Sequence, residues 1–232
     1  MSALAEILVR PDVWRGDRLA QAPLPTVASG FAALDSELPG GGWPRGALTE
    51  LLVDGAGIGE LSLLTFALAK IRENGGWSLL VAPPHPLHAP AWAAAGLDLA
   101  RLAVVSPASG RDALWAMEQA LVSRAPRAVV GWLPYADARA LRRLQVAAAG
   151  SDALAFLFRS TRLAVDASAA PLRLQLAGEE GQLTVRIIKR RGPPLAASIR
   201  LALPRPARLR SRDHAHESPL AGRPAVRQPA HA

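Results

Sequence analysis

Residues 48–61, LTELLVDGAGIGEL, contain an apolar run, a glycine-rich turn and the start of a second apolar segment. This order predicts a buried strand that enters a tight turn and continues as a helix to about residue 73. Four further apolar runs follow at 77–82, 102–105, 128–133 and 153–159, with helical patterns between them near 89–95, 111–124 and 137–149. Apolar strands that alternate with helices predict an α/β fold whose parallel sheet is buried on both faces.

The hydrophobic period changes from helical to alternating after Pro171. Leucines at 172, 174 and 176 alternate with polar residues, and so do the apolar residues at 183, 185 and 187. The sequence GEEG at 178–181 separates the two runs. This pattern predicts a C-terminal antiparallel β-hairpin with one half-exposed face, and residues 198–203 are a candidate third strand.

The pattern divides the chain into three parts. Residues 1–28 form a predicted N-terminal helix and linker, residues 29–203 the α/β core with its hairpin, and residues 204–232 a tail without periodicity. The helix at 2–10 has an apolar stripe that suits packing either on its own body or on a neighbouring domain. The tail is rich in arginine and proline, so we expect it to be disordered.

Composition narrows the functional classes. The 232 residues carry a net charge of +8, but Arg186 to the end has 11 basic and two acidic residues, so the body is close to neutral. The absence of cysteine excludes disulfides, thiolate zinc sites and cysteine nucleophiles. No apolar run is long enough for a membrane span and no secretory signal is recognisable, so we expect a cytoplasmic protein. The five histidines form no predicted metal cluster; they are His85, His88, His214, His216 and His231.

The glycine-rich turn stands where a phosphate loop would stand. Against the pattern G-x-x-x-x-G-K-[ST], Gly59 keeps the second glycine, whereas the lysine position is Glu60 and the hydroxyl position is Leu61. The first glycine is replaced by Asp54. A carboxylate in place of lysine opposes a polyanion, because two like charges about 4 Å apart repel by roughly 4 kcal/mol at an effective dielectric constant near 20. We therefore expect a degenerate phosphate loop.

Two further observations argue against nucleotide chemistry. Gly55 and Gly57 are better explained by the tight turn than by phosphate binding, and the strand at 128–133 contains Gly131 and Trp132 where an ATPase would place a magnesium-binding carboxylate. We expect no catalytic residues, no cofactor, no metal and no small-molecule substrate.

Two segments resemble the RecA recombinase family. Residues 29–52, SGFAALDSELPGGGWPRGALTELL, resemble the entry to the RecA core, TG-x-x-x-LD-x-x-L-x-GGG-x-P-x-G. Residues 93–114, AAAGLDLARLAVVSPASGRDAL, are similar to the RecA segment that carries a catalytic glutamate, and Arg111 stands at that position here. The resemblance implies a RecA-like fold of the phosphate-loop type that has lost its ATPase residues.

Residues 127–159, RAVVGWLPYADARALRRLQVAAAGSDALAFLFR, resemble two RecA-derived families, the SulA inhibitors of cell division and the ImuA accessory proteins. The VWRGD entry at 13–17, the GGGWP segment, the ALRRLQVAAAG helix and the hairpin ending in KRRG at 189–192 favour ImuA. This resemblance implies an accessory role in SOS-induced translesion DNA synthesis, with ImuB as partner and with ImuC and RecA as further contacts. A SulA-type inhibitor that binds FtsZ is the alternative, and an ATPase with an atypical loop is a third hypothesis.

The basic C-terminal end is one candidate interaction surface. It would contact DNA phosphates or an acidic partner, or else would serve only as a solubilising strand end and a tail without contacts. Its candidate residues are Lys189, Arg190 and Arg191 after the hairpin and Arg205, Arg208, Arg210 and Arg212 in the tail.

Aromatic residues after the fourth strand are a second candidate surface. Trp132 and Tyr135 follow the strand at the sheet edge where α/β proteins bind ligands, so they could anchor a partner. Core packing is the competing explanation for Trp132. No membrane contact is expected.

Overall fold

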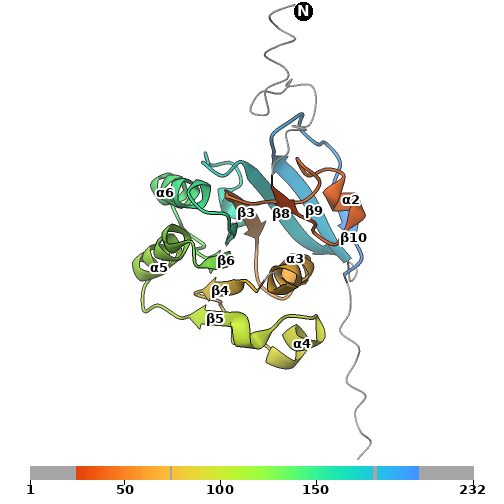
Figure 1. Ribbon diagram of the computed structural model, residues 1–232. Helices are drawn as coiled ribbons and strands as arrows, with labels where there is room; N and C mark the ends of the chain where they lie inside the picture. The colour runs from red at the N-terminus through yellow and green to blue at the C-terminus, as the bar shows by residue number, and fades with distance from the viewer. Residues whose placement is uncertain (1–24, 74, 180–181, 204–232) are drawn as a thin grey trace, which may run out of the picture.

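A computed structural model describes residues 25–73, 75–179 and 182–203 of the chain (Figure 1). The predicted N-terminal helix and the basic tail, with Arg205, Arg208, Arg210 and Arg212, lie outside the described residues. The fold below is therefore that of the predicted core and hairpin.

The described core is built on an eight-stranded sheet in the order β10-β9-β8-β3-β7-β6-β4-β5. Strands β3 to β8 run parallel, whereas β9 pairs antiparallel with β8 and β10 antiparallel with β9. This arrangement confirms the predicted α/β fold and the C-terminal hairpin. The strands are β3 (Ala47–Val53), β4 (Trp77–Val81), β5 (Leu102–Val105), β6 (Pro126–Trp132), β7 (Leu154–Ser160), β8 (Leu172–Glu179), β9 (Gln182–Lys189) and β10 (Ile199–Leu201).

Helices cover the two faces of the parallel strands, with α3 on one side and α5 and α6 on the other (Figure 1). Successive strand residues alternate between the two cores: Val130 packs with α3, whereas Val129 packs with α5 and α6. Such strands read as continuous apolar runs because both faces are buried. The helices are α2 (Ala32–Asp35), α3 (Ser62–Glu73), α4 (Ala89–Ala94), α5 (Gly110–Ser123) and α6 (Ala138–Ala149), with 3₁₀ turns at Leu99–Arg101 and Thr161–Leu163.

The end of the predicted linker belongs to the folded body. Thr26–Val27 forms strand β1, which pairs antiparallel with β2 (Trp43–Pro44). Gly42 is required for this contact, since a Cβ there would lie 2.5 Å from the Val27 carbonyl oxygen. The sequence pattern did not predict this small sheet because each strand has only two residues.

A network of charges lies inside the sheet. Glu50 on β3 is fully buried and accepts hydrogen bonds from Arg159 on β7 and from Arg173 on β8, whose Nε lies 2.7 Å from Glu50 Oε2. Arg173 also donates to the carbonyl oxygens of Leu163 and Asp166, each at 3.0 Å. The prediction that Arg173 belongs to the half-exposed face of the hairpin is therefore wrong, because the segment after β7 covers it.

Candidate functional site

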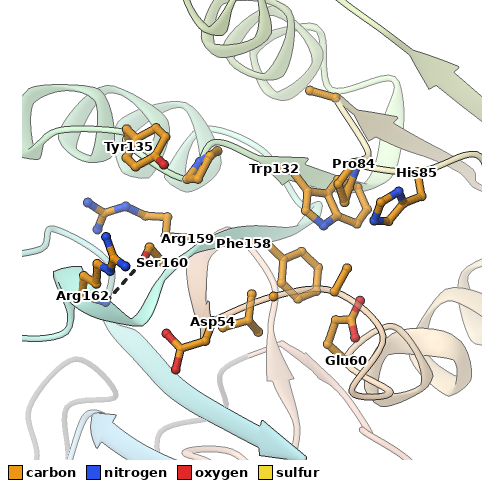
Figure 2. Close-up of a pocket in the computed structure, with 15 residues that line it drawn as sticks. Asp54, Glu60, Pro84, His85, Trp132, Tyr135, Phe158, Arg159, Ser160 and Arg162 are labelled. Carbon is orange, nitrogen blue, oxygen red and sulfur yellow. Dashed lines mark hydrogen bonds between the residues drawn. The ribbon is translucent and has the colours of Figure 1, made fainter.

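The carboxyl ends of β3, β4, β6 and β7 surround an open cleft of about 670 Å³ (Figure 2). The turn after β3 forms one side, and the segments that follow β4, β6 and β7 complete it. Open α/β sheets bind ligands at this edge, where the chain turns between strands and helices. The fold thus places the predicted phosphate-loop segment and both aromatic candidates at one site.

Glu60 dominates the turn after β3. Its side chain is buried, with 5% of the residue exposed, and its carboxylate accepts a hydrogen bond from the Gly57 amide at 3.2 Å. Gly57 has a φ of 91° and Gly59 a φ of 92°, a left-handed conformation that glycine adopts without strain. The Glu60 carboxylate therefore accepts the hydrogen bond of an amide that would otherwise be free to donate to a bound anion.

The other replaced positions of the turn also have a definite environment. Asp54 is exposed at the cleft, on the same side as Glu60 and across from Trp132 and Tyr135 (Figure 2). Leu61 is partly buried against the apolar core on the α3 side of the sheet. Leu61, which stands where a phosphate loop has Ser or Thr, thus packs against the core. Asp54, which replaces the first glycine of the loop, places a carboxylate in the cleft.

The outer side of the turn packs against the C-terminal strands. A Cβ at Gly59 would lie 2.1 Å from Leu203 Cδ1, and a Cβ at Gly178 would lie 3.1 Å from Ile58 Cβ. Gly59 is therefore favoured by its φ angle, and the tip of the Leu203 side chain packs directly against it. These contacts join the turn to the end of β8 and to the residues that follow β10.

The aromatic candidates differ in their environments. Trp132 is partly buried and stacks on Phe158, with ring centroids 5.1 Å apart and an angle of 15° between the planes. Tyr135 is 86% exposed and lies between this cleft and a second hollow of about 530 Å³, which Arg111 also lines. Trp132 thus packs against Phe158 and also lines the cleft, whereas the side chain of Tyr135 is exposed to solvent.

The three basic residues after the hairpin have different contacts. Arg190 is buried and bonded within the chain: its Nη1 lies 2.7 Å from Glu37 Oε2, and its Nε donates to the Pro193 carbonyl oxygen at 2.7 Å. Lys189 Nζ donates to the Ser168 carbonyl oxygen at 2.7 Å. Burial lowers the pKa of Lys189, and the nearby charge of Arg173 lowers it further. Arg191 is exposed.

Among the residues that the structure describes, no group of three or more His, Asp or Glu side chains comes together. His88 has a structural role instead, because its Nδ1 accepts from the Ala91 amide at the start of α4. His85 is exposed beside the cleft. No helix among residues 25–73, 75–179 and 182–203 combines the length and the apolar character of a membrane span.

Sequence reasoning missed two arginines at this edge of the sheet. Arg159 and Arg162 follow the apolar run of β7 and line the cleft. A charged residue at the carboxyl end of a buried parallel strand was the available signal, since that end is where sites form.

The fold and the cleft define a RecA-like α/β domain, and the sequence comparison agrees. The family of RecA N-terminal domains matches residues 13–130, and the chain belongs to that family. It is 32% identical over 111 residues to protein RecA of Picosynechococcus sp., covering 48% of this chain and 31% of that protein. Over 115 residues it is 33% identical to protein RecA of Chlorobaculum tepidum, covering 50% of this chain and 33% of that protein. The aligned region is about a third of the length of these curated relatives.

Proposed function

We propose that this protein is a non-catalytic accessory protein of SOS-induced translesion DNA synthesis that acts with ImuB and the error-prone polymerase ImuC. The observation that carries the proposal is the position of Glu60, whose carboxylate is buried in the turn and bonded to the Gly57 amide. A carboxylate held there both repels phosphate and occupies a donor that phosphate would need. A RecA-family domain built in this way acts through its surface.

The alternative within the RecA-derived families is a SulA-type inhibitor that binds FtsZ. The KRRG sequence on which the resemblance to ImuA rests lies at 189–192, between β9 and β10, and the chain continues from it into a third strand; this extension supports the ImuA-like role. Gly131 adds to the argument against an ATPase, because its missing side chain would point at Met117 in the core and not into the cleft.

Nucleotide binding is the first test. We expect isothermal titration of Mg-ATP into the full chain to show no micromolar binding. The double variant Glu60→Lys/Leu61→Thr should still not hydrolyse ATP, because Gly131 and Arg111 leave the metal and the attacking water without carboxylates. Micromolar Mg-ATP affinity in the unaltered protein would contradict the expected loss of nucleotide binding, and ATP hydrolysis would contradict the non-catalytic role.

Partner capture is the second test. We expect the immobilised full chain to retain ImuB and not FtsZ. A truncation after Leu203 removes six arginines and two acids and keeps the described sheet, so its effect is separate from that of unfolding. Capture should weaken in this variant, since arginines select acidic partners. Capture of FtsZ in place of ImuB would identify the SulA-type function.

The matched variant for this experiment lacks residues 1–10, which contain the other predicted docking segment. If capture survives truncation after Leu203 but is lost without residues 1–10, the contact lies at the N-terminal end. A truncation before Ile187 would be uninformative, because Ile187 and Leu201 are buried in the core.

A further inference from the structure

The three C-terminal strands have one sheet face that no described helix covers. Alternate residues of β8, β9 and β10 point into the core on the α3 side, where Leu176, Val185 and Leu201 are buried. On the opposite face the segment after β7 covers Arg173 at the start of β8, whereas the other residues between these buried positions are exposed or half-exposed. Helices α5 and α6 lie over the strands from β3 to β4 and leave this face open (Figure 1). The residues of this open face are Gln175, Ala177, Gln182, Thr184, Arg186, Ile188 and Arg200.

Arg186 and Arg200 give the open face its charge. Arg200 lies opposite Thr184, two positions along β9 from Arg186, so the two arginines are diagonal neighbours about 7–8 Å apart along the sheet. Both are exposed, and neither takes part in the ion pairs of the described residues. Like charges placed so closely on a sheet repel each other unless an anion lies between them.

The remaining charges near the face are few. Glu179 lies at the hairpin end, where its Oε2 accepts from the Thr184 hydroxyl at 3.3 Å, and together with Gln182 and Arg200 these residues line a shallow hollow. Lys189 lies at the other end of β9 and donates to a backbone carbonyl. The face therefore carries an excess of positive charge, with small polar side chains between the arginines.

We propose that the open face of β8, β9 and β10 binds the phosphate backbone of a nucleic acid through Arg186 and Arg200. The separation of the arginines is of the order of the distance between neighbouring phosphates along a strand, so each arginine can neutralise one phosphate. The face has no aromatic residue for base stacking and no projecting element for a groove, so the contact is to phosphate and is independent of base sequence.

The test is fluorescence-anisotropy titration of a labelled oligothymidylate with the full chain, at several salt concentrations between about 50 and 200 mM. The double variant Arg186→Gln/Arg200→Gln should bind on the order of tenfold more weakly, and the slope of log K against log salt should become shallower by about 1.4, or about 0.7 for each lost phosphate contact. Arg186→Lys/Arg200→Lys should keep most of the slope because it keeps both charges.

The matched control is Arg139→Gln/Arg142→Gln, which removes two exposed arginines from α6, outside the open face. This control should leave affinity and slope unchanged. Equal losses in both double variants, or an unchanged slope in the first, would overturn the proposal. A larger loss for a polyglutamate peptide than for DNA would assign the face to an acidic protein instead. The assay needs no partner protein, so this inference and the proposed adaptor role can fail separately.

Discussion

Replacing Glu50 with alanine should lower the free energy of unfolding by about 3–5 kcal/mol. Glu50 is fully buried between Arg159 and Arg173, which are themselves almost completely buried. Its removal leaves two arginine charges in the sheet without an anion, and backbone carbonyls neutralise them only in part. An uncompensated buried charge is among the few causes that destabilise a domain by this amount.

Thermal or denaturant unfolding followed by circular dichroism measures this effect. At about 2–4 °C per kcal/mol for a domain of this size, the melting temperature should fall by roughly 10 °C. The control is Asp152→Asn, because Asp152 is 55% exposed and pairs with Arg45 and Arg127, each at 3.1 Å. Exposed pairs are each worth less than about 1 kcal/mol. If the Glu50 variant had the same melting temperature as the Asp152 variant, the buried network would be dispensable for stability.

The variant Gly131→Asp should also be severely destabilised, by several kcal/mol. This substitution restores the carboxylate that a RecA-type magnesium site would have on β6, yet the position faces the core. A Cβ at Gly131 would lie 2.5 Å from Met117 Sδ and 3.7 Å from Leu157 Cδ1. The new carboxylate would be buried among apolar atoms with no cation beside it, which is a costly arrangement.

Gly131→Ala separates the charge effect from the volume effect. The methionine side chain is flexible and can yield to one methyl group, so this variant should lose about 1–3 kcal/mol. Melts recorded with and without Mg²⁺ complete the experiment. If Gly131→Asp were as stable as Gly131→Ala and gained stability from Mg²⁺, the position would be compatible with a metal site after all.

The sequence predicted the strands and the hairpin well, because both follow from local hydrophobic periods. The order of the strands in the sheet could not be predicted from the sequence. Strand β3 lies between β7 and β8, and a pairing between segments so far apart in the chain leaves no local pattern. Helix ends were predicted to within about one residue where the apolar stripe is long: α5 spans Gly110–Ser123 against the predicted 111–124, and α6 spans Ala138–Ala149 against the predicted 137–149.

At the site, residue identities were readable from the sequence but side-chain positions were not. The replacement of lysine by Glu60 is visible in the sequence, whereas the hydrogen bond that holds its carboxylate depends on the φ angles of the turn. Arg173 followed an alternating pattern that predicts exposure, but the segment after β7 buries it. Arg190 belongs to a basic cluster for which the sequence left open a partner contact or a solubilising strand end, whereas in the structure its guanidinium pairs with Glu37, 153 residues earlier in the chain.

The buried network also constrains how the protein is made. Glu50 is separated from Arg159 by 109 residues and from Arg173 by 123 residues. At roughly 5–20 residues per second of synthesis, β3 is made at least about 5 s before either arginine exists. During that interval the central strand has neither of its neighbours, and its apolar residues are available to other chains. The nascent chain should therefore depend on chaperones until β8 has emerged, and refolding from denaturant should be slow compared with that of domains rich in local contacts.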